Sequence, residues 1–120
     1  MEKALGFGGF FFRAKDREAL AAWYRDCLGI PLVPDDYETP CWQQEAGETV
    51  FAPFAADTDY FAKDKAFMLN FRVRDLDAMV AQLEAKGVAV RMGPEEPNGR
   101  FAWTEDPEGT PIELWEPRGR

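Results

Sequence analysis

The chain carries the same short pattern twice, and this repeat is the feature that most constrains its fold. Phe-Arg-Ala-Lys-Asp at residues 12–16 begins one helical segment, and Phe-Arg-Val-Arg-Asp at residues 71–75 begins another. In both places an apolar strand pattern leads to an aspartate suited to cap a helix. Apolar residues then follow at helical spacing, and a glycine ends the segment at Gly29 or Gly87. Such a repeat predicts a duplicated structural unit, and two such units usually build one shared site.

Length and composition limit what these units can be. A chain of 120 residues with 46% hydrophobic content can bury one core, so we expect a single domain made of two half-modules. The net charge of -8 argues against nucleic acid or an anionic membrane as a partner, since both are bound by concentrated Lys and Arg. No apolar run approaches the ~20 residues of a membrane span, and the first residues lack the layout of a secretory signal. With only Cys27 and Cys41 there is no disulfide framework, and we expect a cytoplasmic protein.

The first half-module is expected to span residues 5–57. Aromatic residues predict a strand over Phe7–Arg13, and apolar spacing predicts a helix from about Arg17 to Cys27. The proline-rich stretch that follows predicts short antiparallel strands over Pro40–Gln44 and Thr49–Ala52. Residues 58–65 have no clean periodicity and are expected to link the two modules.

The second half-module is expected to span residues 66–117 and to repeat the same order of elements. Each half therefore reads β-α-β-β-β, which places the chain in the α+β class. The expected elements are strands over Phe67–Arg72, Val88–Arg91, Arg100–Thr104 and Pro111–Trp115, a helix over Leu76–Leu83, a loop at residues 93–99 and a tight turn at residues 106–109.

Three segments resemble signatures of the vicinal oxygen chelate superfamily, which includes glyoxalase I, bleomycin-resistance and fosfomycin-resistance proteins and extradiol dioxygenases. Trp-Tyr and Cys-Leu-Gly within residues 16–32 resemble its D-x6-FY-x3-LG signature, and residues 70–77 and 106–117 resemble its second-module and closing-strand signatures. The resemblance covers nearly the whole chain. It implies two paired βαβββ modules whose curved mixed sheets enclose a cavity, the glyoxalase-like fold, commonly completed by a second subunit. We therefore expect a homodimer that binds a small-molecule ligand.

The same resemblance indicates where metal-dependent members carry their ligands, and this chain departs from that pattern. Gly9 and Met68 stand where those members carry His or Gln and His, and only Glu113 is kept. The chain has no histidine for a transition metal, and a hard cation needs several oxygen ligands. We therefore predict no metal and no other cofactor. In the alternative, a divalent metal recruits ligands from a partner subunit or from loops, the loop candidates being Glu45, Glu48 and Asp57.

Strand alternation predicts which side chains face the cavity, because residues two apart share a face. If Gly9, Met68 and Glu113 point inward, their neighbours two positions away do so as well. The residues between them are expected to face the helices as core. The inward set then includes Phe11, Arg13, Asn70, Arg72, Pro111 and Trp115, and the core set is Phe10, Phe12, Leu69, Phe71, Val73, Ile112 and Leu114.

Several inward side chains suggest chemistry. Arg13 and Arg72, at equivalent positions of the repeat, would flank an anionic or carbonyl-bearing ligand, unless one pairs with Glu113 and the other reaches solvent. Glu113 is the catalytic candidate if an apolar setting raises its pKa, whereas a nearby Arg would make it a structural carboxylate. Aromatic residues beyond the needs of a small core predict cavity walls and, at Tyr60 and Phe61, a lid. The predicted ligand-binding residues are Phe11, Arg13, Trp42, Tyr60, Met68, Asn70, Arg72, Trp103 and Trp115.

These observations favour one function and leave another open. The favoured function is similar to that of the bleomycin-resistance branch, in which a metal-free dimeric cavity holds a small aromatic or anionic molecule without chemistry. The alternative is an enzyme, a lyase, isomerase or dioxygenase relative acting on a glutathione conjugate or an oxygenated metabolite through Glu113 and the arginines. A third class, a purely structural or interaction module, would have a tightly filled cavity.

Overall fold

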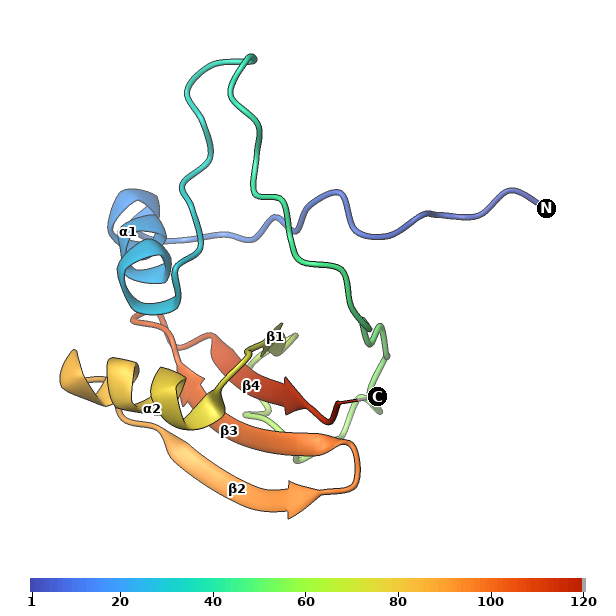
Figure 1. Ribbon diagram of the computed structural model, residues 1–120, viewed down its shortest axis with the longest axis vertical. Helices are drawn as coiled ribbons and strands as arrows, with labels where there is room; N and C mark the ends of the chain where they lie inside the picture. The colour runs from blue at the N-terminus through green and yellow to red at the C-terminus, as the bar shows by residue number, and fades with distance from the viewer. Residues whose placement is uncertain (120) are drawn as a thin grey trace.

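A computed structural model, which describes residues 1–119, confirms the α+β class and the glyoxalase-like fold expected from the sequence. Two helices and four strands are formed in this part of the chain (Figure 1). In chain order they are α1 (Arg17–Leu28), β1 (Leu69–Arg72), α2 (Leu76–Ala85), β2 (Arg91–Glu96), β3 (Gly99–Glu105) and β4 (Pro111–Pro117).

Each copy of the repeat forms its helix for the same local reason. Asp16 caps α1 by accepting a hydrogen bond from the backbone N of Ala19 at 3.1 Å, and Asp75 caps α2 by accepting from Ala78 N at 3.0 Å. At the other end of α1, Gly29 takes a left-handed φ of 73°, which a residue with a Cβ atom adopts at a cost. Within residues 1–119, neither helix is long and apolar enough to cross a membrane.

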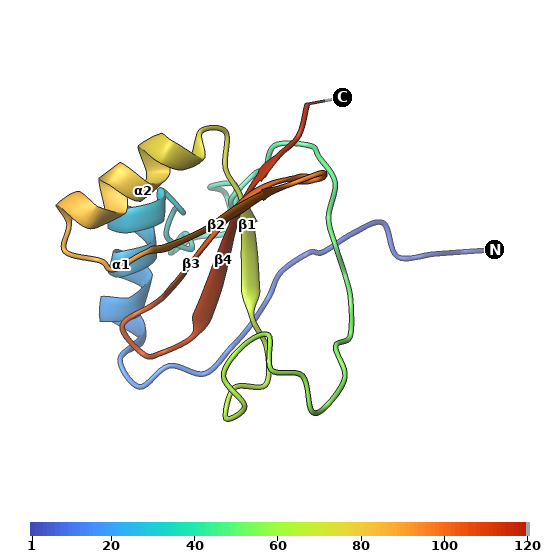
Figure 2. The ribbon, with the colours of Figure 1, turned by 90° about the horizontal axis from the view of Figure 1, so that it is seen from below.

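The four strands form one mixed sheet in the order β1-β4-β3-β2. β1 runs parallel to β4, and the other two pairs are antiparallel. The register places Asn70 opposite Glu113 and Arg72 opposite Trp115 on the same face. Both helices cover the other face, so this face is left to the irregular segment that connects α1 to β1 (Figure 2).

The core lies between the helices and the sheet, and it confirms the alternation expected for β1 and β4. Ile112 and Leu114 are fully buried, whereas Glu113 between them points to the opposite face. Each fully buried aliphatic side chain contributes about 1.5–3 kcal/mol relative to an exposed one. The other core members are Leu20, Tyr24 and Cys27 from α1, Leu76, Val80 and Leu83 from α2 and Ala102 from β3, with Leu69, Phe71 and Val73 packed against them.

A buried carboxylate joins the helix of the first half to the turn between β3 and β4. Asp106 is 3% exposed and accepts hydrogen bonds from the Tyr24 hydroxyl at 2.7 Å and from the backbone N of Glu108 and Thr110 at 2.8 and 3.1 Å. Glu108 in turn accepts from two backbone N–H groups at the start of α1, at 2.7 and 3.0 Å. Burial, reinforced by the Asp106 carboxylate, raises the pKa of Tyr24. The turn therefore positions α1.

The first half-module differs from the prediction. The three segments expected as strands, Phe7–Arg13, Pro40–Gln44 and Thr49–Ala52, are irregular, and in the described chain none makes a backbone hydrogen bond to a strand. Phe10 and Phe12, expected in the core, are 47% and 37% exposed. An extended segment becomes a strand only where its backbone pairs with a free edge, and these segments meet the second half through side chains instead, as Phe10 and Phe12 do with Phe67. The helix α1 is thus the regular secondary structure that the first half contributes to the described chain. The outer edge of β1 is unpaired.

The second half-module has the predicted order of elements, but β2 is shifted. The prediction placed this strand over Val88–Arg91 and a loop over residues 93–99, whereas β2 runs on to Glu96. Val88 and Val90 pack against the core before the strand begins. Pro94 is tolerated because β2 is an edge strand and its pairing with β3 is irregular at this point.

Candidate functional site

A pocket of about 490 Å³ lies along β1, between residues 42–50, the sheet and helix-side residues such as Leu28, Ile30 and Met79. Asn70 and Arg72 of β1 and Trp115 of β4 line it from the sheet, and Trp42 lines it from the irregular segment. The volume falls within the range of about 300–1,000 Å³ that is typical of small-molecule sites. The fold therefore provides a ligand-sized cavity beside β1 that is lined by four of the predicted site residues.

Trp115 is a fixed wall of this pocket. Its side chain is 5% exposed, and its ring lies parallel to that of Phe101, with an angle of 3° between the planes and 6.2 Å between the centroids. The indole Nε1 donates a hydrogen bond to the Asn98 carbonyl at 3.0 Å. Trp42, by contrast, is 45% exposed. The Trp115 wall is thus held in place, and the Trp42 wall is accessible. Such a pair of rings suits a flat apolar molecule.

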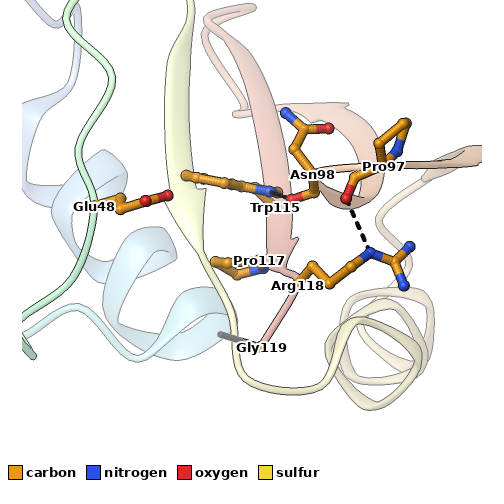
Figure 3. Close-up of a pocket in the computed structure, with 7 residues that line it drawn as sticks. All are labelled: Glu48, Pro97, Asn98, Trp115, Pro117, Arg118 and Gly119. Atoms are coloured by element: carbon orange, nitrogen blue, oxygen red, sulfur yellow. Dashed lines mark hydrogen bonds between the residues drawn. The ribbon is translucent and has the colours of Figure 1, made fainter.

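A second, smaller pocket of about 150 Å³ lies beside the first. Figure 3 shows Glu48 and Asn98 on either side of the Trp115 ring, with Arg118 held by the Pro97 carbonyl. Glu48, Trp115 and Pro117 line both pockets. Trp115 therefore separates a larger space over β1 from a smaller one at the ends of β2 and β4.

Two arginines and two glutamates line the larger pocket, namely Arg72, Arg74, Glu45 and Glu48. Arg72 donates to the Glu45 carbonyl at 3.0 Å, and Arg74 donates to the Glu45 carboxylate at 3.1 Å. The Arg74 and Glu45 side chains are 84% and 83% exposed, so this ion pair is worth little and a ligand can compete with it. Gly47 lies against the Arg72 guanidinium where a Cβ atom would collide with it. The loop therefore wraps closely around Arg72.

Glu113 lies at the other end of the same sheet face, in a cluster of neutral donors. Its carboxylate is 7% exposed and accepts hydrogen bonds from the Tyr60 hydroxyl, from Asn70 Nδ2 at 2.7 Å and from Trp103 Nε1 at 2.9 Å. The Arg91 guanidinium carbon lies 4.5 Å from the centre of the Trp103 ring. Burial, together with the hydrogen bond and charge of Glu113, raises the pKa of Tyr60 to about 12. We call Glu113, Tyr60, Asn70 and Trp103 the Glu113 cluster.

The Glu113 cluster fits a metal ion poorly. A metal at Glu113 would have to displace neutral donors from the carboxylate, and Gly9 and Met68 offer no replacement at the positions where metal-dependent relatives have ligands. Among residues 1–119, no group of three or more Cys, Asp or Glu side chains is placed to hold a metal ion. Glu45 lies on the arginines instead.

The predicted site residues fall into three groups. One lines the larger pocket, a second belongs to the Glu113 cluster without lining the pocket, and a third lies outside both. In that order the groups are Trp42, Asn70, Arg72 and Trp115; Tyr60, Trp103 and Glu113; and Phe11, Arg13 and Met68.

Two features of the site were not anticipated. From the sequence, Glu45 was expected only as a possible metal ligand, and residues 45–48 were expected only to connect two strands. Gly47 is the signal that pointed to a close approach, because a glycine in a turn often marks a place where another group packs against the backbone.

Comparisons with known proteins agree with this fold. The family model described as "Glyoxalase-like domain" matches residues 9–115. TnmS3, an antibiotic binding protein from Streptomyces sp. CB03234, is 31% identical over 87% of this chain and 88% of its own, with a TM-score of 0.57. A member of the glyoxalase/bleomycin resistance protein/dioxygenase superfamily from Sphaerobacter thermophilus DSM 20745 is 21% identical over 86% of this chain and 90% of its own, with a TM-score of 0.54.

A further relative matches only in part. A glyoxalase/bleomycin resistance protein from Streptomyces sp. CB03234 is 42% identical, but the match covers 40% of this chain and 42% of that protein, with a TM-score of 0.38. No curated protein gives a significant match. The family assignment therefore rests on the match over residues 9–115 and on the similarity to TnmS3. The chain belongs to the glyoxalase-like domain family, and with it to the vicinal oxygen chelate superfamily.

Proposed function

We propose that this protein binds a small aromatic or anionic molecule in the larger pocket, without a metal ion. The observation that carries the proposal is the lining of this pocket, where Trp42 and Trp115 lie together with Arg72. Indole rings offer contact area to a flat ligand, and a guanidinium offers paired N–H groups to a carboxylate. TnmS3, which covers most of this chain at 31% identity, is described as an antibiotic binding protein, and this supports a binding role.

The arrangement of Glu113 supports binding over catalysis. In the alternative function, a lyase, isomerase or dioxygenase relative would use Glu113 as a base or metal ligand on a glutathione conjugate or an oxygenated metabolite. Its two oxygens, however, already accept three hydrogen bonds, and among residues 1–119 no arginine forms a hydrogen bond or ion pair with them. A carboxylate has about four lone-pair positions, so at most one is left at Glu113 for a substrate proton.

We also propose that two copies of the chain form the binding unit. Phe11 and Phe51 are 93% and 79% exposed, and Tyr37 is fully exposed, which is more aromatic surface than a monomer normally leaves to water. The outer edge of β1 is unpaired as well. A second copy would cover these rings and supply a further wall next to residues 42–50. Native mass spectrometry of the purified protein would give a dimer mass, and a monomer at micromolar concentration would contradict this part.

Matched ligands test the binding proposal. We would titrate the protein with 2-naphthoate, an aromatic anion, and with 2-naphthamide, its neutral counterpart, by isothermal calorimetry. Arg72→Ala should weaken naphthoate binding about tenfold, because it removes a charge-assisted contact worth about 1.5 kcal/mol, and should leave naphthamide binding nearly unchanged. Arg100→Ala is the matched control, since Arg100 pairs with Asp77 of α2 at 2.8 Å and does not line the pocket.

Two results would contradict the proposal. If neither compound binds, or if Arg100→Ala weakens naphthoate as much as Arg72→Ala does, the pocket is not the anion site. Elemental analysis of protein purified without chelators tests the metal-free part. A stoichiometric transition metal, lost together with naphthoate binding on addition of EDTA, would overturn it.

A further inference from the structure

The side chain of Tyr60 occupies a position beside the pocket although it comes from the linker and not from the sheet. Its hydroxyl donates to Glu113 Oε2, and its ring meets that of Trp103 edge to face, with 6.3 Å between the centroids. A further ring contact, at 5.6 Å, is made with Phe54 of the same segment. Tyr60 is nevertheless 46% exposed. One hydrogen bond and a few ring contacts thus hold an otherwise accessible side chain in place.

The Tyr60 hydroxyl fills a position at which the Glu113 carboxylate accepts a hydrogen bond from a neutral donor. Asn70 and Trp103 belong to the sheet, so their hydrogen bonds to Glu113 remain whether or not the linker moves. The third acceptor position on the buried carboxylate is the one that Tyr60 fills. A buried carboxylate with an unfilled acceptor position is costly, so another O–H group would be favoured there when Tyr60 leaves.

Asn70 links the Glu113 cluster to the larger pocket. Asn70 both lines the pocket and donates to Glu113. Asn70 and Arg72 share a face of β1 two residues apart, which corresponds to about 7 Å along a strand. A flat ligand whose carboxylate lies at Arg72 can therefore place a hydroxyl at Glu113 if the two groups stand at opposite ends of a fused aromatic ring system.

We propose that Tyr60 is an internal substitute for a phenol group of the ligand, and that the Glu113 cluster is a phenol subsite which the ligand enters by displacing Tyr60. The ligand class is then an aromatic molecule with a phenolic hydroxyl at one end and an anionic group at the other. The assignment of the anionic end rests on the binding function proposed above, whereas the phenol subsite can be tested without it.

The first experiment empties the subsite and refills it. Tyr60→Ala removes the phenol ring, and p-cresol, which is the missing side chain, is added to the folded variant. We expect p-cresol to raise the melting temperature of Tyr60→Ala and to shift the NMR signal of the Trp103 indole N–H. The methyl ether 4-methylanisole, which cannot donate a hydrogen bond, should do neither. Adding Glu113→Gln to this variant should weaken the response to p-cresol at least about fivefold, because the charged acceptor is lost.

The second experiment starts from the wild-type protein and does not need the cavity variant to fold. We expect 6-hydroxy-2-naphthoate to bind the wild type about fivefold more tightly than 2-naphthoate, since only the former can donate to Glu113. Tyr60→Phe keeps the ring but lacks the competing hydroxyl, so it should widen this ratio. Arg100→Ala is the control, because Arg100 pairs with Asp77 of α2 and does not line the pocket. It should leave the ratio unchanged.

The outcomes separate the two proposals. The subsite is wrong if p-cresol and 4-methylanisole act alike on Tyr60→Ala, or if the two naphthoates bind equally in the wild type and in Tyr60→Phe. If neither naphthoate binds but p-cresol still rescues Tyr60→Ala, the phenol subsite stands and the anionic pocket is wrong. Loss of naphthoate selectivity in Arg100→Ala would also overturn the assignment to Tyr60.

Discussion

Replacing Asp106 should be among the most damaging single changes in this protein. Its buried carboxylate accepts from the Tyr24 hydroxyl and from the backbone N of Glu108 and Thr110. Hydrogen bonds to a charged group contribute about 1.5–3 kcal/mol each, but the two N–H groups of the turn can reach water after the change. We therefore expect Asp106→Ala to lower the free energy of unfolding by about 4 kcal/mol, a large part of the 5–15 kcal/mol typical of a domain.

Urea denaturation followed by tryptophan fluorescence would measure this change, and a double-mutant cycle would locate its source. Tyr24→Phe alone should cost about 1.5 kcal/mol, and in the Asp106→Ala background it should cost almost nothing, because its partner is already absent. A loss below about 1 kcal/mol for Asp106→Ala, or additive losses in the cycle, would refute the view that this hydrogen bond joins the two halves.

Two further predictions concern pH and backbone conformation. The pKa of Tyr60 rises from 10 to about 12 on folding, so its contribution is complete below pH 10 and is lost between pH 10 and 12. Two pKa units correspond to about 2.7 kcal/mol, which we reduce to about 1 kcal/mol because solvent reaches the Tyr60 side chain. Between pH 10 and 12, Tyr60→Phe should therefore lose about 1 kcal/mol less free energy of unfolding than the wild type. If the free energy of unfolding falls equally steeply with pH in both proteins, this prediction is wrong. Gly99→Ala should cost about 3 kcal/mol in the same denaturation assay, because Gly99 has a φ of 138° and an added Cβ would strike the Glu116 carbonyl oxygen. Gly8→Ala, where an added Cβ meets nothing within 4 Å, is the control and should be nearly neutral.

The second half of the chain could be predicted because its signals are local. Asp75 caps α2 by binding a backbone N–H only three residues further along the chain. The Asp-Pro-Glu-Gly turn pairs β3 with β4, which follow each other closely in the sequence. Once β4 is placed, its alternation fixes Glu113 and Trp115 on the open face. Each of these inferences needs only a few neighbouring residues.

The first half and part of the site could not be predicted, because they depend on partners that a local pattern does not name. Alternation in Phe7–Arg13 states which side chains would share a face, but it does not state which strand edge would accept the segment. Tyr60 was expected to form a lid, yet its partner Glu113 lies 53 residues away, and the linker around Tyr60 has no periodicity from which a contact could be read. The pairing of Arg72 with the carbonyl of Glu45 is equally invisible in sequence, since any residue has a carbonyl.

The proline on β2 has a consequence for how copies of this chain can assemble. Pro94 lacks an N–H group, and Glu95 and Glu96 add negative charge to the same exposed edge, so further strands cannot extend the sheet on that side. The opposite edge, along β1, carries no such protection. If two copies pair along their β1 edges, neither copy has another edge that can accept a strand. The sheet therefore stops growing at two copies. By blocking the β2 edge, Pro94 favours a closed dimer over an open-ended fibre in any association between strands of two copies.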